Sequence, residues 1–150
     1  MSDAPREASG APGAPLGDAL GAPAFANPAA PVDLAAAAGA LADTWSPRVV
    51  AQVNDAFVKV ARVHGEFVWH AHALEDELFL VLRGRLRLDF EDRPAVTLGP
   101  GECYVVPRGV RHRPVAEEEV WLALVEPAAT RHTADVVSNR TRSVAEQLGG

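Results

Sequence analysis

The sequence predicts an all-β domain of the barrel or sandwich type, and two observations support this prediction. From Arg48 onward, short runs rich in Val, Phe and Leu recur at roughly eight- to twelve-residue spacing, separated by Gly, Pro, Asn and Asp. Several runs also alternate apolar with polar residues, which indicates one packed and one solvated face. The expected strands are residues 48–53, 56–63, 66–72, 77–82, 85–90, 95–99, 103–107 and 120–127.

The segments on either side of these strands have a different composition. The first 31 residues contain twenty Ala, Pro or Gly and no periodicity, so residues 1–31 are expected to be a disordered leader. Residues 32–47 are expected to form a short helix and a lead-in, with Asp33 as the N-cap. The barrel would then span residues 48–127, and residues 128–150 would be a polar tail with a short helix near its end.

Composition and charge exclude several classes of function. With 48% hydrophobic and 23% charged residues, the 150-residue chain is typical of one globular domain. The formal net charge of -6 argues against a nucleic-acid-binding protein, and no apolar stretch is long enough to span a membrane. Asp3, Glu7 and Asp18 precede any apolar run, so no secretory signal is expected. A single cysteine, Cys103, excludes an internal disulfide and fits a reducing cytoplasm.

Two histidines and a glutamate lie where one metal ion could reach all three. His70 and His72 share the expected strand 66–72, so their side chains would point to the same face about 6 to 7 Å apart. Residues 74–76 indicate a turn, after which Glu77 opens the next strand and its carboxylate can return to the same centre. Imidazole nitrogens with a hard carboxylate favour a divalent first-row metal over calcium.

A third histidine follows a second group of turn residues. Residues 101–112 contain a glycine turn, a strand, a second turn at Pro107 and Gly109, and then His112. This order would deliver His112 to the open side of the first cluster, where it would be a third imidazole for the same ion.

Together the two groups resemble the two motifs of the cupin superfamily. The resemblance covers about residues 45–127 and implies a double-stranded β-helix, or jelly-roll barrel, with a short N-terminal helix. It departs from the family pattern in two places, because four residues rather than five follow the first glycine and Ala116 stands at the final Asn position. Residues 81–88 and 105–119 look most like small single-domain, type-2 cupins labelled phosphomannose-isomerase-like. The first motif is matched by Gly65, His70, His72, Glu77 and Gly84, and the second by Gly101, Pro107, Gly109 and His112.

The resemblance also implies a metal-dependent function. In cupins the ligand set leaves a position open for a small oxygen-bearing ligand, and it serves isomerases, dioxygenases and lyases alike. The chain is therefore expected to be a metal-dependent enzyme acting on a small-molecule substrate or, alternatively, a non-catalytic cupin that binds or senses a small ligand. One divalent ion, Fe, Mn, Ni or Zn, would be held at the positions matching the family's ligands, which are His70, His72, Glu77 and His112.

A general base for such an enzyme would have to come from the wall of the barrel. The sequence offers Glu66, Tyr104 and Glu102 as candidates, and each also has a purely structural interpretation. The catalytic residues therefore stay open at this point.

Other polar residues have plainer interpretations. His64, beside a glycine turn, is expected to be exposed, and Cys103 is expected to be a small strand residue rather than a nucleophile. Glu117–Glu119 are expected to form a charged loop. Arg85 and Arg87 could line a pocket for an anionic substrate, or simply mark a half-exposed strand.

A homodimer is a further expectation. A barrel of about 80 residues buries a limited core, and cupins commonly pack sheets across a two-fold axis. The segment expected to cross between subunits is residues 45–60, with Trp45, Val49, Val50, Val53 and Phe57.

Overall fold

The structure is a computed structural model that describes residues 25–128 and 143–149. Most of the expected leader, residues 1–24, and most of the expected tail, residues 129–142, lie outside the described residues. The last residues of the expected leader contact the sheet, because the Phe25 N–H donates to Gln52 Oε1 over 2.7 Å.

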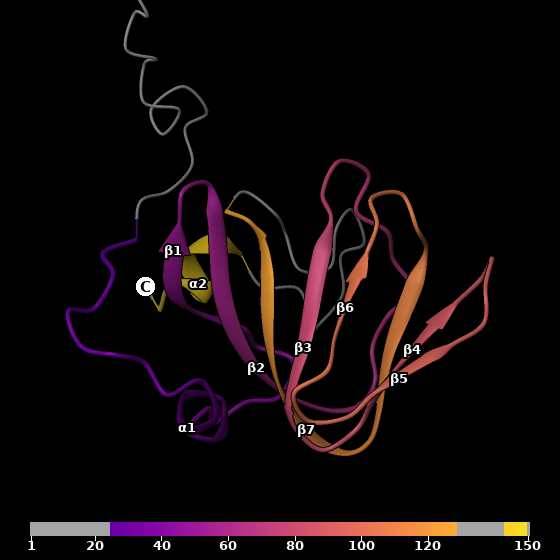
Figure 1. Ribbon diagram of the computed structural model, residues 1–150, viewed down its shortest axis with the longest axis horizontal. Coiled ribbons are helices and arrows are strands. Elements are labelled where there is room, and N and C mark those ends of the chain that lie inside the picture. Colours follow the sequence, from indigo (N-terminus) through magenta and orange to yellow (C-terminus); the bar gives the residue numbers. More distant parts are fainter. Residues whose placement is uncertain (1–24, 129–142, 150) are drawn as a thin grey trace, which may run out of the picture.

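Seven strands form one curved antiparallel sheet in the described part of the chain (Figure 1). The strands follow the order β1-β2-β7-β3-β6, and β4 pairs with both β5 and β7, so the sheet curls into a barrel. The predicted all-β fold is therefore confirmed, and its topology is that of a double-stranded β-helix. The strands are β1 (Arg48–Val53), β2 (Ala56–Glu66), β3 (Glu77–Arg83), β4 (Leu86–Phe90), β5 (Val96–Leu98), β6 (Cys103–Val106) and β7 (His112–Pro127).

Strand β7 joins the parts of the barrel, since it pairs with β2, β3 and β4. It begins earlier than expected and contains Glu117–Glu119, so the prediction of a charged loop there was wrong. The reason is a register shift in the β2–β7 ladder between Val63 and Gly65, opposite these glutamates. The extra residues bulge outward, and their exposed carboxylates remain in solvent while the strand continues.

The prediction of a strand over residues 66–72 was also wrong. Strand β2 continues through Gly65, which has a φ of +86°, and ends at Glu66. Beyond it, the Phe67 N–H donates to Pro114 O over 2.9 Å, but proline has no N–H to continue the ladder. Only one bridge follows, between His70 and His112.

Two short helices accompany the sheet. Helix α1 (Leu34–Gly39) begins as predicted at Asp33, whose Oδ1 accepts the Ala36 N–H over 3.0 Å. It packs close to β7, because a Cβ placed on Gly39 would lie 2.6 Å from the Trp121 ring. Helix α2 (Val144–Gln147) follows the second undescribed stretch. None of the helices within the described ranges has the length and hydropathy needed to cross a membrane.

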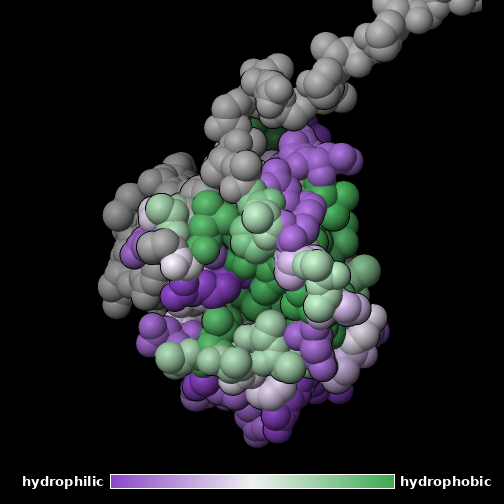
Figure 2. Space-filling view, turned by 90° about the vertical axis from the view of Figure 1, so that its left-hand side faces the viewer, coloured by the Kyte–Doolittle hydropathy of each residue, from purple (hydrophilic) through white to green (hydrophobic). Residues whose placement is uncertain are grey.

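The barrel core extends to the N-terminal lead-in. Trp45 stacks on Phe67, with ring centroids 4.6 Å apart and an interplanar angle of 6°, and its indole N–H donates to the His64 carbonyl. Of the residues expected to cross between subunits, Trp45, Val49 and Phe57 are buried within the chain, Val50 is half-buried and Val53 is 60% exposed. Figure 2 shows apolar residues gathered in the middle of the face that carries α1 and β1, bordered by polar ones.

Candidate metal centre

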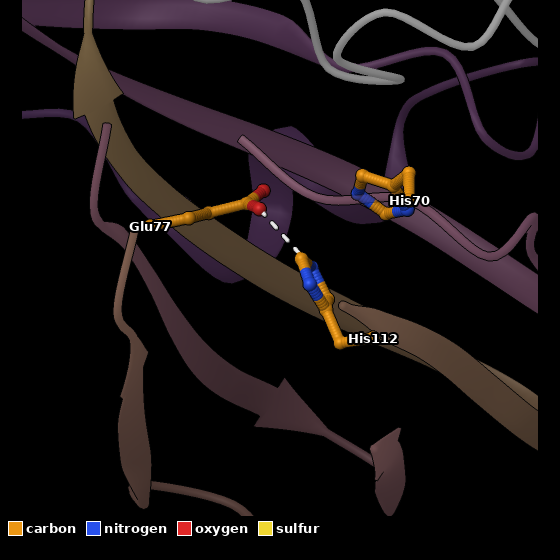
Figure 3. A group of neighbouring side chains, drawn as sticks. All are labelled: His70, Glu77 and His112. Carbon is orange, nitrogen blue, oxygen red and sulfur yellow. Dashed lines mark ion pairs between the residues drawn. The ribbon is translucent and has the colours of Figure 1, made fainter. Parts of the chain in front are cut away.

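The candidate ligands come from three separate backbone segments. His70 lies in the extended segment after β2, Glu77 is the first residue of β3, and His112 is the first residue of β7 (Figure 3). The backbones of His70 and His112 exchange two hydrogen bonds of 3.0 and 2.9 Å. The His72 carbonyl accepts the Gly109 N–H over 2.7 Å, which ties His72 to the turn of the second motif. Residues far apart in sequence are thereby placed around one point.

These four side chains are buried and close together. The ring centroids of His70 and His112 are 4.3 Å apart, and those of His70 and His72 are 5.2 Å apart. Glu77 Oε2 lies 3.1 Å from His72 Nε2 and 3.6 Å from His112 Nε2. None of the four residues is more than 4% exposed.

Within this cluster the side chains form two groups that share Glu77. Ligand atoms of His70, Glu77 and His112 lie within 4.8 Å of one another. Ligand atoms of His72, Glu77 and Glu126 do the same. The structure therefore brings all four sequence-predicted residues to one place, with His72 grouped apart from the other two histidines, and it adds Glu126.

Two of the imidazoles have a fixed orientation. Nδ1 of His70 lies 2.9 Å from Val68 O, and Nδ1 of His112 lies 2.9 Å from Val110 O. A carbonyl only accepts, so each Nδ1 carries a proton, and Nε2 is the ring nitrogen left to face the centre. Histidines held in this way are suited to bind a metal through Nε2.

Burial and charge act differently on the individual groups. Burial, reinforced by His112, lowers the pKa of His70 to about 4, so this ring is neutral at pH 7. Burial also acts to lower the pKa of His72, but the Glu77 carboxylate 3.1 Å from its Nε2 outweighs burial and the pKa is raised. Burial opposes ionisation of Glu77, yet His112 and His72 hold the pKa of this carboxyl well below its usual range.

Glu126 was not predicted from the sequence. It lies near the end of β7, 2% exposed, with Oε1 2.6 Å from Lys59 Nζ. Burial raises the pKa of Glu126 to about 7, the charge of Glu77 adds to the rise, and Lys59 opposes it. A signal was present, since Leu122, Leu124 and Glu126 alternate in β7 and therefore share its inward face.

The predicted general-base candidates lie outside both groups. Glu66 is exposed at the end of β2, where its carboxylate is 3.3 Å from Arg113 Nη1. Tyr104 lies half-buried in β6 with its ring 5.8 Å from that of Phe90. Glu102 accepts an N–H within its own turn. Glu66, Tyr104 and Glu102 thus each make a structural contact, which was the alternative interpretation of these residues from the sequence.

The remaining polar candidates are at the surface. His64 and Cys103 are exposed. Arg87 pairs with Asp89 over 2.7 Å and with Glu117 over 3.2 Å, on the outside of the barrel. Arg85 and Arg87 also line a cavity on this surface, and because Glu117, Glu118 and Glu119 line it too, its wall carries charges of both signs.

A small apolar cavity adjoins the centre. Trp45, Phe67, Phe79, Leu122 and Leu124 contribute to its walls, and His70 and Glu77 also line it. A group entering this cavity would meet the centre from an apolar side.

The buried atoms fit a metal ion. His72 Nε2, His112 Nε2 and Glu77 Oε2 are inaccessible to solvent, and none makes a hydrogen bond of good geometry within the described residues. Imidazole nitrogens and a carboxylate oxygen that converge in this way match the donor preferences of a divalent first-row ion.

Comparison with known proteins agrees with the fold. Residues 57–126 match the family described as Cupin domain. A cupin-2 domain containing protein from Shewanella frigidimarina is 44% identical, with a TM-score of 0.61 over 64% of this chain and 93% of the other. The chain belongs to the cupin superfamily.

Two further relatives are similar in part. Protein NMB1881 from Neisseria meningitidis is 28% identical, with a TM-score of 0.60 over 65% of this chain and 99% of the other. The uncharacterized protein YdbB of Bacillus subtilis is 41% identical over 64 residues, which are 43% of this chain and 57% of YdbB. The match to this curated relative thus spans little more than half of its length.

A hydroquinone 1,2-dioxygenase from Sphingomonas shares the fold. It has a TM-score of 0.61 at 22% identity, over 71% of this chain and 36% of the dioxygenase. This likeness concerns the barrel alone.

Proposed function

We propose that this cupin binds one divalent first-row metal ion and acts as a metal-dependent enzyme on a small oxygen-bearing metabolite. The observation that carries the proposal is the orientation of the imidazoles, since the Nδ1 atoms of His70 and His112 are held by carbonyls and their Nε2 atoms are left for an ion. The proposed ligands are His70, His72, Glu77 and His112.

A bound ion would polarise an oxygen atom of the substrate. The protein's own contribution is to fix the ligands and to surround one side of the centre with apolar residues. His70 and Glu77 border the apolar cavity, so its lining favours a substrate with an oxygen-bearing end next to a small apolar part. Isomerase, dioxygenase and lyase chemistry are all compatible with this arrangement.

A second candidate function is non-catalytic binding or sensing of a small ligand. It is supported by the positions of Glu66 and Tyr104, which lie outside both groups and leave the proposed reaction without an assigned base. Turnover across a panel of sugars, hydroxy acids and enols with the Fe(II), Mn(II), Ni(II) and Zn(II) forms would favour the enzyme, and binding without turnover would favour the sensor.

The metal site itself is tested by His72→Ala. The variant loses one imidazole and should bind substantially less metal than the wild type, measured by elemental analysis after equilibration and desalting. His64→Ala is the matched control, because His64 is exposed and belongs to neither group. Full metal occupancy in the His72 variant would contradict the ligand assignment.

A homodimer, a cytoplasmic location and a closer relation to phosphomannose-isomerase-like cupins also remain predictions. Sedimentation at high protein concentration tests the first, and a clean monomer would contradict it.

A further inference from the structure

A buried charged pair lies directly beside the candidate centre. Lys59 of β2 and Glu126 of β7 are 2.6 Å apart between Nζ and Oε1, with side chains 1% and 0% exposed. Buried ion pairs rarely add stability over apolar residues of the same size. Stability alone therefore does not explain why a buried ion pair lies so close to the candidate metal centre.

The pair has a second partner from the C-terminal helix. Lys59 Nζ also donates to Gln147 Oε1 over 2.5 Å, and Gln147 is fully buried although α2 is only four residues long. Helix α2 thus reaches the barrel interior through one amide. Lys59 is held from two sides, by Glu126 and by Gln147.

The carboxylate of Glu126 also lies close to the candidate centre. A carboxylate oxygen of Glu126 lies within 4.8 Å of ligand atoms of His72 and Glu77. Its Oε2 is buried and has no hydrogen-bond partner in residues 25–128 and 143–149. Lys59 therefore fixes one oxygen of Glu126, and the carboxylate lies beside His72 and Glu77.

Charge argues against a second ion in the group of His72, Glu77 and Glu126. Two divalent ions together with the Lys59 ammonium would leave a large positive excess over the two carboxylates in a buried region. Glu126 instead places a carboxylate within 4.8 Å of ligand atoms of His72 and Glu77, where its charge can support these two residues around one ion.

We propose that Lys59, Glu126 and Gln147 form a positioning network that couples the C-terminal helix α2 to the metal centre. Docking of α2 presents Gln147 to Lys59, which fixes Glu126 beside His72 and Glu77. By linkage, a metal ion that favours this arrangement also stabilises the docked helix. The inference rests on the proposed metal site.

The first test measures metal affinity in the full-length chain. Mn(II) and Zn(II) are titrated against a chelator of known affinity into the wild type, Glu126→Gln, Gln147→Met and Ala145→Ser. The amide introduced by Glu126→Gln still offers Lys59 an oxygen, so the loss reports the carboxylate, and affinity should fall about 10- to 100-fold. Gln147→Met removes the second acceptor of Lys59, which lies farther from the centre than Glu126, and should lower metal affinity about fivefold. Ala145→Ser, on the exposed side of α2, should bind like the wild type.

The second test uses hydrogen exchange of the α2 amides. Metal loading should slow exchange in residues 143–149 of the wild type by a factor of the same order as the affinity lost in Gln147→Met. The slowing should disappear in Glu126→Gln. A purely structural Gln147 would protect α2 equally with and without metal.

The outcomes separate this inference from the metal site itself. If the wild type binds metal while both network variants keep wild-type affinity, the network is wrong and the metal site stands. If the wild type binds none of the metals, both are wrong. Should Glu126→Gln not fold, Gln147→Met decides by the same two measurements.

Discussion

The two sides of the candidate centre are built by different means. On one side His70 and His112 are fixed by backbone carbonyls and by a bridge between their own main chains. On the other side His72 and Glu126 are held by charge, through Glu77 and Lys59. The backbone therefore orients His70 and His112 for a metal. The positions of His72 and Glu126 depend instead on the protonation of charged groups and on side chains from distant strands.

The largest effect is expected from a substitution on the charged side of the centre, which contains His72, Glu126 and Lys59. Lys59→Met leaves the buried Glu126 without its partner, so this carboxyl must take up a proton or stay as an unpaired charge, and the free energy of unfolding should fall by about 3–5 kcal/mol. The double variant Lys59→Met/Glu126→Met removes both charges and should recover most of that stability, but not the metal affinity. Denaturant unfolding and metal titration of the two variants check this. A double variant as unstable as the single one would show that the pair matters for packing rather than charge.

The next effect concerns the backbone-held side. His112→Ala removes one fixed imidazole and should lower metal affinity about 100-fold or more, which is a larger loss than that of Glu126→Gln. The backbone bridge to His70 does not need the ring, so the metal-free barrel should still fold. Chelator competition and far-UV circular dichroism test the two statements. Equal losses in both variants would remove the distinction between ligand and outer carboxylate.

The smallest expected effect is on pH dependence. The pKa of His72 is raised, so in the metal-free protein a proton occupies this ring at pH values where His70, with a pKa of about 4, is already neutral. A metal must displace that proton, so apparent affinity should fall as pH drops from 8 to 6, by at most about tenfold per unit.

The same proton has the opposite effect on the metal-free fold. Its attraction to the Glu77 carboxylate contributes stability that is fully present below the ordinary histidine pKa of about 6.5 and is lost as pH rises through the raised pKa. Metal titrations and unfolding curves at pH 6, 7 and 8 check both signs. Metal affinity independent of pH over this range would contradict the assignment of the proton to His72.

Much of this molecule was predictable from local sequence. Alternating runs and turn residues indicated the strands, and the two glycine-bounded motifs placed His70, His72, Glu77 and His112 together. The strand expected at residues 66–72 failed for a reason that lies in its partner, because Pro114 cannot donate.

The charged side of the centre was harder to predict. Lys59 and Glu126 are 67 residues apart, and only their inward position in apolar strands hinted that each needs a buried partner. Gln147 is 88 residues from Lys59 and belongs to a helix of one turn, for which the sequence carries no pairing signal. Side-chain pairs across such separations depend on the assembled fold.

The end of the expected leader has a consequence for how copies of this chain can meet. Strand β1 lies at one end of the sheet path, where an unpaired strand invites another to add to it. The Asn27 side-chain amide accepts the Gln52 N–H over 2.7 Å and donates to the Gln52 carbonyl over 2.9 Å. The Asn27 amide thus satisfies the two backbone groups of Gln52 that a neighbouring strand would otherwise pair with. It therefore hinders the addition of another strand at this edge of the barrel.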